Sequence, residues 1–330
     1  MKKDFNLDFL RVMSMLLVIV IHVANYYGKA FHQISHVSFF GSVIFNTVTR
    51  VCVPIFFMIS GALLLSKEYD ARKNRTRIYR NCVVLGVFTV IYLFWDQYYM
   101  GVHFDSYLEL IGHPERTMLW FMYAIIALYI SLPFIKRMVD GLNRREEKLF
   151  VLLWLGMNGL LNLIDIKVSY QIPVVSGTYY LGYFIIGYLI RKYKDQFPFK
   201  KYNIPLIIVT VLSFACTIIL TYIHSINENT NDKTLLTYSN ILCMIPSLAI
   251  FILIYFNRTN RESKIIRFLS KYSFGIYLIH GILLNITMNY FDYVHINSFF
   301  GIPFSATIIF LSSLIVVYML KKIPLINAWI

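Results

Sequence analysis

The sequence predicts an all-α polytopic membrane protein with about ten transmembrane helices. Of its 330 residues 58% are hydrophobic and 15% are charged, and the mean hydropathy is positive. Soluble domains are about 45–50% apolar and about 25% charged, so a soluble domain is excluded. The apolar residues also form runs of about 20 residues, the length that crosses roughly 30 Å of hydrocarbon as a helix.

Ten such runs follow one another along the chain. They cover residues 7–27, 38–65, 79–99, 118–136, 148–165, 175–192, 203–224, 235–256, 272–291 and 300–320. The first run follows two lysines as a signal peptide does, but it contains ionisable residues and no small-residue cleavage site follows it, so we expect it to remain as a helix. The sequence has no long linker, low-complexity tract or internal repeat, which predicts one membrane domain over residues 1–330.

The positive charges predict the orientation in the membrane. The chain has 31 Lys and Arg against 17 Asp and Glu, a net charge of +14. When the connecting segments are assigned alternately to two sides, 25 of these cations fall on one side and four on the other, and the remaining two lie within spans. The positive-inside rule places the basic side and both termini in the cytoplasm, as for a multi-pass protein of the cytoplasmic membrane. Topology explains the basic excess, and we expect no nucleic acid partner.

The four cysteines carry no recognisable binding motif. Cys52, Cys82, Cys216 and Cys243 lie inside apolar runs without a C-x-x-C pairing. This arrangement indicates neither a disulfide framework nor a zinc site. We therefore expect them to be packing residues and predict no metal.

Three ionisable residues share one stripe of the first helix. At 100° per residue Asp8, Arg11 and His22 lie within about 60° of one another, and His22 lies about 16 Å outward of Arg11. Ionisable groups inside a span are costly and usually functional, so we place all three in a candidate catalytic group. The alternatives are an i,i+3 ion pair at the helix entrance for Asp8 and Arg11, and a buried imidazole bonded to a carbonyl for His22.

The second span contains a deep arginine. Arg50 lies near mid-depth, where it requires a partner or a wet cavity, and we add it to the catalytic group. Pro54, four residues later, releases a backbone carbonyl one turn earlier and favours a kink. Ser60 and Gly61 are typical of a close helix-packing position.

The loop after the second span is the most basic segment and ends in Arg77-Ile-Tyr-Arg80. Two arginines at i,i+3 beside the membrane are suited to bidentate binding of phosphates. The alternative is that these arginines only help to set the orientation of the protein in the membrane, as basic residues do in any cytoplasmic loop.

Polar and aromatic residues in later spans are further candidates. Trp120 and Tyr123 lie at the outer end of the fourth span, and Asp96 at the outer end of the third. We assign them to an acceptor site, although an aromatic belt explains the rings equally well. His280 lies about 12 Å into the ninth span and is therefore expected to be shallower than His22; its alternative is a core histidine.

At these residues the chain resembles the acyltransferase-3 family of ten-helix membrane enzymes. The resemblance extends over the whole chain, and its fragments follow one another in the same order. They are Asn6-Leu-Asp8-Phe-Leu-Arg11, the Arg-x10-His spacing from Arg11 to His22, Arg50 with Val-Pro-Ile-Phe-Phe-Met-Ile-Ser-Gly, Arg77-x-x-Arg80, Leu119-Trp120-Phe121 with Tyr129 and Pro133, Tyr183-Phe-Ile-Ile-Gly187-Tyr188, and Ser273 to Tyr277-Leu-Ile-His280.

The resemblance implies transfer of an acyl group, most often acetyl, from acyl-CoA bound from the cytoplasm to an extracytoplasmic glycan or similar acceptor. It implies that Arg77 and Arg80 contact the donor phosphates and that His22 is essential, with Arg11 at the arginine position of the same motif. We place His280 in the donor site as well. Some family members have an acidic residue soon after the histidine, whereas Val23 to Val37 contain none here. If a carboxylate orients His22, it must come from Asp96, Asp105, Glu109 or Asp165.

Two mechanisms and a second function remain open at this point. His22 either takes the proton of the acceptor hydroxyl or receives the acyl group before handing it on, with Arg50 or Tyr123 stabilising the tetrahedral intermediate. A polar stripe through the membrane would also serve a transporter or exporter of a small polar solute, such as an amino acid, or of polysaccharide. The Arg77 and Arg80 pair and the lack of an internal repeat favour the enzyme.

Overall fold

The computed structural model of the chain describes residues 4–102, 118–163, 179–257 and 263–329, and within these segments the regular structure is entirely helical. In chain order the elements are α1 (Phe5–Lys29), α2 (His36–Thr49), α3 (Cys52–Leu64), α4 (Ala71–Tyr98), α6 (Trp120–Gly141), α7 (Arg144–Trp154), the π-helical segment η2 (Leu155–Leu160), α8 (Leu161–Leu163), α9 (Tyr179–Lys192), the short 3-10 helix η3 (Phe199–Tyr202), α10 (Asn203–Asn227), α11 (Ile241–Asn257), α12 (Lys264–Tyr290), α13 (Ser298–Leu320) and α14 (Pro324–Asn327).

Side-chain caps decide where several helices begin. Asp70 accepts a hydrogen bond from the backbone N–H of Lys73, and Ser263 caps α12 in the same way. Both α4 and α12 therefore begin eight residues before the apolar runs that predicted them, because polar residues continue a helix once its first N–H groups are satisfied. The helix predicted from the eighth run begins later than expected: α11 begins at Ile241, and residues 235–240 of that run lie in the loop before it.

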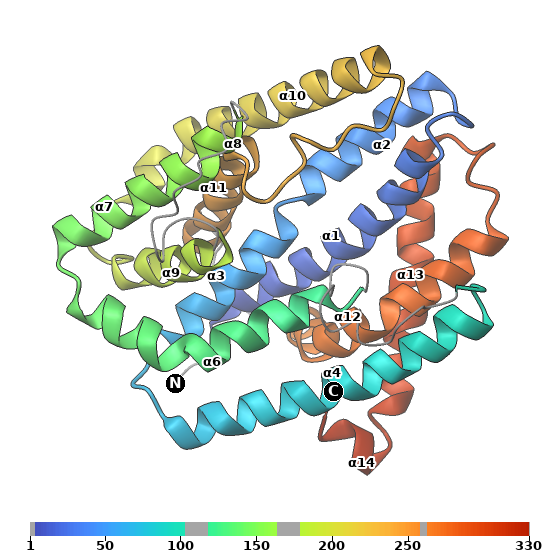
Figure 1. Cartoon of the computed structure of the whole chain (residues 1–330). Helices are drawn as coiled ribbons and strands as arrows, with labels where there is room; N and C mark the ends of the chain where they lie inside the picture. The colour runs from blue at the N-terminus through green and yellow to red at the C-terminus, as the bar shows by residue number, and fades with distance from the viewer. Residues whose placement is uncertain (1–3, 103–117, 164–178, 258–262, 330) are drawn as a thin grey trace.

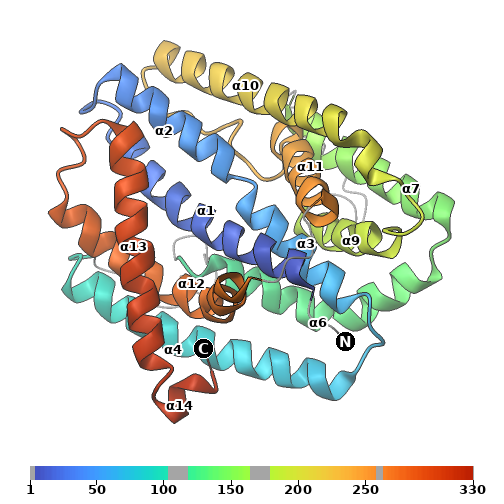
Figure 2. The ribbon, with the colours of Figure 1, turned by 180° about the vertical axis from the view of Figure 1, so that it is seen from behind.

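Six helical stretches of the described chain are long and apolar enough to cross a membrane, so the chain is a multi-pass membrane protein. They are Phe5–Lys29, His36–Leu64, Ala71–Tyr98, Trp120–Gly141, Phe199–Asn227 and Ser298–Leu320. The helix α1 runs through the middle of the molecule, whereas α4 and α10 lie on its outside (Figures 1 and 2). In agreement, 56% of the apolar window of α1 is buried, against 17% for α4 and 22% for α10.

The helix α10 turns its apolar side outward. Its buried residues are small and polar and recur every three or four positions along one face, which lies toward α11. They are Thr210, Ser213, Thr217, Thr221 and Ser225. Large apolar side chains such as Ile204, Val211 and Leu212 are exposed on the rest of the helix. Small residues between helices and apolar residues outside are the pattern of a helix surrounded by lipid.

Consecutive long helices run in alternate directions, which gives the bundle two ends. At one end Asn6 donates to the carbonyl of Tyr255, and Lys321 donates to that of Lys271, so the start of α1 meets the end of α11 and the start of α12 meets the end of α13. At the other end Tyr26 donates to Asn285. We call the first the basic end, because the basic segments around α4, α7, α9, η3 and α12 begin or finish there.

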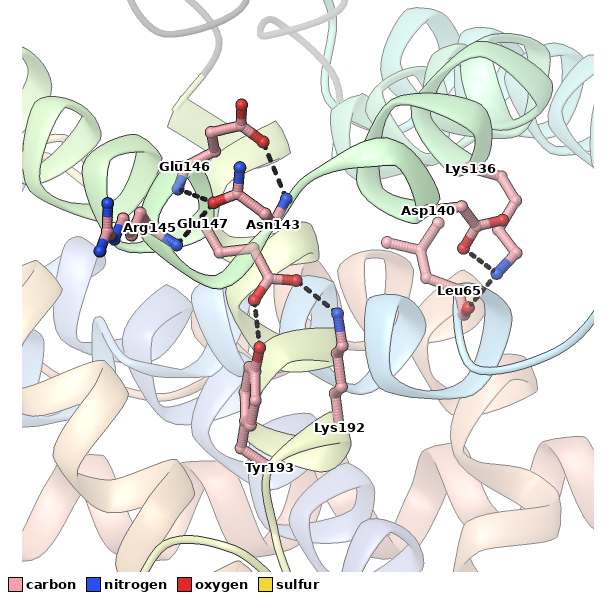
Figure 3. A network of polar contacts seen from close by, with 9 residues as sticks. All are labelled: Leu65, Lys136, Asp140, Asn143, Arg145, Glu146, Glu147, Lys192 and Tyr193. Carbon is pink, nitrogen blue, oxygen red and sulfur yellow. Dashed lines mark hydrogen bonds and ion pairs between the residues drawn. The ribbon is translucent and has the colours of Figure 1, made fainter.

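Two groups of polar contacts tie helices together at the basic end, one joining α7 to α9 and the other joining α6 to the residue after α3 (Figure 3). The carboxylate of Glu147 on α7 is 3% exposed, accepts from Lys192 at 2.6 Å and is bonded to the hydroxyl of Tyr193. Lys136 at the end of α6 donates to Asp140 and to the carbonyl of Leu65 after α3. A buried carboxylate without partners would cost folding free energy. The contacts of Glu147 therefore fix how α7 packs against α9.

The second span is broken into α2 and α3 at Arg50 and Val51, one turn before Pro54. The kink expected from Pro54 is thus confirmed. A Cβ on Gly61 would lie 1.7 Å from the carbonyl oxygen of Phe184, and one on Gly187 would lie 2.1 Å from that of Met58. The backbones of α3 and α9 therefore touch, as the pattern at Gly61 predicts.

The cysteine prediction is correct in part. All four cysteines are free, and Cys52 and Cys243 are buried. Cys82 on α4 and Cys216 on α10 are exposed, so they do not pack in the core. The reason is that α4 and α10 lie on the outside of the bundle, where an apolar run faces lipid rather than protein.

Candidate active site

A cavity of about 800 Å³ lies between α1, α3, α4, α6 and α12, with the loop before α11 and Tyr180 of α9 completing its wall. This size is within the usual range for small-molecule sites. Its polar and aromatic lining residues are Arg11, His22, Asn25, Arg50, Phe56, Ser60, Arg77, Arg80, Asn81, Trp120, Phe121, Tyr129, Tyr180, Thr237, Tyr238, Ser273, Phe274 and Tyr277.

The cavity is elongated along α1. Lining residues run from Arg11 to Asn25, a rise of about 21 Å along a helix. The helix α3 runs antiparallel to α1 and lines the cavity from Cys52 to Leu64. We call the end with Arg11, Arg77, Arg80 and Tyr129 the arginine end, and the end with His22, Arg50, Trp120 and Tyr238 the inner end.

The arginine end is built on the first turns of α4. Arg77 is half-buried, and Arg80 is exposed and donates through Nε and Nη2 to the carbonyl oxygen of Trp329, at 3.2 and 3.0 Å. Across the cavity, Tyr129 of α6 is held by a hydrogen bond from Asn74 to its carbonyl at 2.8 Å. Both guanidinium groups therefore border the same space without a carboxylate partner among the described residues.

Arg11 differs from these arginines because it is paired. Its Nη1 lies 2.9 Å from Oδ1 of Asp8, and the hydroxyl of Ser270 on α12 donates to the same carboxylate oxygen at 2.8 Å. The expected i,i+3 ion pair is thus present, and it also ties α1 to α12. Arg11 lines the cavity, whereas Asp8 stands behind it.

Two histidines meet at the inner end. His22 is half-buried and lines the cavity, and its ring centroid lies 5.3 Å from that of His280 on α12. His280 is only 1% exposed and is bonded through Nδ1 to the carbonyl of Tyr277. The expectation that His280 is the shallower residue is wrong, because α12 begins at Lys264 and its inner part runs beside α1.

Arg50 is held at the inner end by neutral groups. Its Nε donates to Oδ1 of Asn46 at 2.9 Å, and Asn46 in turn donates to Asn25 at 2.7 Å. The guanidinium lies 5.5 Å from the ring centroid of Tyr238, a cation–π contact. Trp120 stacks on the same tyrosine with ring centroids 6.0 Å apart.

The cavity is strongly positive. Four arginines line it, and none of its described lining residues is acidic. Near the inner end, burial together with the positive charges of Arg50 and Lys29 lowers the pKa of Lys233, in the loop after α10. A cavity of this charge in a low-dielectric setting favours an anionic ligand or the development of negative charge in a reaction.

The structure brings together His22, Arg11, Arg50, Arg77, Arg80 and Trp120 on one cavity. Asp8 and His280 contact lining residues from behind. Tyr123 and Asp96 are outside the cavity wall, and Asp96 lies near Tyr26 and Tyr92. The other carboxylates considered for His22, which are Asp105, Glu109 and Asp165, lie outside the described residues.

Sequence reasoning missed several residues of the wall. Tyr238 is the clearest case, because it lies in a segment that reads as the start of an apolar run. Tyr180 and Asn25 carry no charge and were not distinguishable from packing residues. Tyr129, Ser273 and Tyr277 belonged to family motifs without an assigned role. Only their placement around one cavity identifies them.

These features define a class: a multi-pass helical membrane protein with a positively charged cavity that reaches a histidine pair inside the bundle. The family model of an acyltransferase domain matches residues 4–322, and the chain therefore belongs to the acyltransferase-3 family. Membership supports acyl transfer as its activity. The chain has no significant match among curated proteins or among solved structures.

Proposed function

We propose that this protein is an O-acyltransferase that moves an acetyl group from cytoplasmic acetyl-CoA to a hydroxyl of an extracytoplasmic acceptor, a cell-surface glycan. In this proposal the whole chain is one domain of ten spans in the cytoplasmic membrane. Both termini and the basic end face the cytoplasm. The alternating helix directions and the gathering of basic segments at one end support this orientation.

One observation carries the proposal: the arginine pair and His22 border the same cavity. Arg77 and Arg80 stand where the phosphates of a nucleotide donor would arrive from the basic end. The space beyond them leads along α1 between Ile59, Leu63 and Ile125, which suits the narrow pantetheine arm. Its thioester would then reach the inner end beside His22.

Arg80 binds a backbone carbonyl in the structure, so the donor phosphate would replace the carbonyl of Trp329 as its partner. A phosphate is the stronger acceptor of the two, because it is negatively charged and can accept two parallel N–H bonds from one guanidinium. The exchange costs little, since Arg80 is exposed and the carbonyl has access to water.

In the proposed reaction, the neutral imidazole of His22 acts as the general base beside the thioester of acetyl-CoA. One ring nitrogen of His22 takes the proton of the acceptor hydroxyl while its oxygen attacks the acetyl carbonyl carbon. The tetrahedral intermediate then collapses with cleavage of the C–S bond, and the proton on His22 passes to the departing CoA sulfur. The products are an acetyl ester and CoA, and no further reactant is needed.

Arg50 is the group that we assign to the developing oxyanion. It lies on the cavity wall without a carboxylate partner among the described residues and is oriented by Asn46 and Tyr238. A donor that is already in place needs no reorganisation during the reaction, and such donors typically contribute 10²–10³-fold to kcat. Arg11, whose charge is balanced by Asp8, is assigned to the passage of the donor.

The aromatic wall supports a sugar as acceptor. The rings of Trp120, Tyr180 and Tyr238 lie together, with centroid separations of 5.7 Å from Trp120 to Tyr180 and 6.0 Å from Trp120 to Tyr238. Such surfaces pack against the C–H faces of a sugar ring while leaving its hydroxyls free. Tyr123 and Asp96 stand outside this wall, and we propose that they act on the acceptor before it reaches Trp120.

The proposal is tested by release of CoA from acetyl-CoA in proteoliposomes, measured with and without an extract of cell-envelope glycan. Wild-type protein is expected to release CoA and to acetylate the glycan, as seen by mass spectrometry, whereas His22→Ala should do neither. Release of CoA that does not depend on any acceptor, or wild-type product with correctly inserted His22→Ala, would contradict it. A transporter would move solute without consuming acetyl-CoA.

A further inference from the structure

One ring nitrogen of His280, Nε2, lies in the interior of the bundle without a hydrogen bond from the described residues. Its Nδ1 is bonded to the carbonyl oxygen of Tyr277, and because a carbonyl only accepts, Nδ1 carries the proton. No carboxylate contacts the ring among the described residues, so the buried imidazole is neutral and its Nε2 has a free lone pair. This Nε2 is buried and has no hydrogen-bond partner in the part of the chain that the structure describes.

The imidazole of His22 lies beside that of His280 and can supply the missing hydrogen bond. The two rings are tilted by 43° with their centroids 5.3 Å apart. At this separation, edges turned toward each other bring two ring nitrogens within the roughly 3 Å of an N–H···N hydrogen bond. His280 is fixed by Tyr277 and by its burial, whereas His22 is half-buried and borders the cavity, so His22 is the ring that turns.

We propose that His280 is a positioning residue for His22, and this inference rests on the proposed function. In it, Nε2 of His280 accepts the single ring proton of neutral His22. The other nitrogen of His22 is then left bare and directed into the cavity, toward the acceptor hydroxyl. A carboxylate does this for histidine bases in many enzymes. Here the neutral His280 takes that place, and the stretch after His22 has no acidic residue through Val37.

The proton balance of the reaction is unchanged by this pair. When the acceptor oxygen bonds to the acetyl carbon, its proton moves to the bare nitrogen of His22. The resulting cation keeps its hydrogen bond to Nε2 of His280, which lowers the cost of placing a positive charge beside Arg50 and Lys29. The proton then leaves from the same nitrogen to the CoA sulfur as the C–S bond breaks, and both histidines return to their starting state.

Two amide substitutions distinguish the roles of the two ring nitrogens of His280. In His280→Asn the amide nitrogen takes the place of Nδ1 and keeps the bond to the carbonyl of Tyr277, but the acceptor at Nε2 is lost. In His280→Gln the longer side chain places an amide oxygen near the position of Nε2. Both variants are polar and similar in size, so they disturb packing to a similar degree.

The test compares kcat and KM for acetyl-CoA with envelope glycan as the acceptor. We expect His280→Asn to lose about 10²-fold in kcat, and His280→Gln to stay within about tenfold of wild type, each with KM unchanged. A kcat for His280→Asn within twofold of wild type would overturn the inference. So would a raised KM with unchanged kcat, because that result would make His280 a donor-binding residue, the role first assigned to it from the sequence.

Two controls keep the outcomes distinct. If wild-type protein shows no transfer, the proposed function fails; if wild type is active, His22→Ala is inactive and His280→Asn behaves as wild type, only this inference fails. Should His280→Asn not fold, wild-type protein labelled with [¹⁵N]histidine gives a second test. A hydrogen-bond correlation between the rings of His22 and His280 supports the inference, and its absence in protein loaded with CoA overturns it.

Discussion

At the arginine end of the cavity, Arg77 and Arg80 stand one turn apart on a single helix, α4, whereas at the inner end His22, Arg50 and Tyr238 come from α1, the α2–α3 break and the loop before α11. At the arginine end Arg80 is exposed and Arg77 is half-buried. At the inner end Asn46 and Tyr238 orient Arg50, and the ring of His22 lies beside that of His280.

This difference indicates that the arginine end binds the donor and the inner end carries out the chemistry. A pair of cations that water reaches is adapted to capture an anion and contributes to affinity. Chemistry requires groups that are already oriented, as Arg50 is by Asn46 and Tyr238. Substitutions at the two ends should therefore affect different kinetic constants.

His22→Ala removes the proposed base at the inner end. Loss of a general base typically costs 10²–10⁴-fold, so we expect kcat to fall by about 10³-fold or more while acetyl-CoA still binds. The matched control is His32→Ala, which removes an exposed histidine just beyond the end of α1 and should leave kcat unchanged. Equal loss in both variants would show that the effect is not specific to the cavity.

Arg50→Met removes the proposed oxyanion donor while keeping a long side chain. We expect kcat to fall by about 10²–10³-fold, as for removal of one such donor elsewhere, with little change in KM. Arg50→Lys keeps the charge but loses the Nε bond to Asn46, and its kcat should be intermediate. A Lys variant no better than the Met variant would show that geometry rather than charge matters.

Much of this architecture follows from the sequence, and the exceptions have a common physical cause. Apolar runs, the break before Pro54 and the packing at Gly61 were predictable because they depend on neighbouring residues in the chain. The starts of α4, α11 and α12 were not, since caps and loops override hydropathy at helix ends.

The site shows the same pattern. His22, Arg50, Arg77 and Arg80 were identifiable because an ionisable group in or beside a span is unusual. Tyr238 and the role of His280 depend on which helices pack together, and no pattern in one segment specifies that. The contact between His22 and His280 joins residues 258 positions apart in the sequence.

Arg77→Ala combined with Arg80→Ala tests the arginine end. A charge-assisted hydrogen bond contributes about 1.5–3 kcal/mol, and because water reaches both side chains we expect the pair together to contribute about as much as one such bond. KM for acetyl-CoA should therefore rise by roughly 10–100-fold with kcat nearly unchanged. Arg72→Ala with Arg75→Ala is the control, because it removes the same charge at the same i,i+3 spacing from exposed positions of α4 that do not line the cavity. KM should rise in the Arg77 and Arg80 variant but not in the control. Equal KM values would show that the two arginines act only through their general positive charge and not as a specific phosphate site.

Asn46→Ala tests the support behind Arg50 and should have the smallest effect. Removing a group that orients a functional residue typically costs about 10–100-fold, and we expect the lower figure because Tyr238 still contacts the guanidinium. Ser42→Ala on the same helix removes a buried hydroxyl that bonds only to the carbonyl of Phe39 and is the control. A loss of kcat as large as that of Arg50→Met would mean that Asn46 itself acts in the reaction.

In the proposed function, one cavity carries the acetyl group from the basic end to the opposite side of the membrane. The most direct test uses proteoliposomes whose basic end faces outward, with radiolabelled acetyl-CoA outside and envelope glycan enclosed. We expect labelled glycan inside and free CoA outside, and neither with His22→Ala. Labelled glycan that forms only when the glycan is also outside would contradict transfer across the membrane.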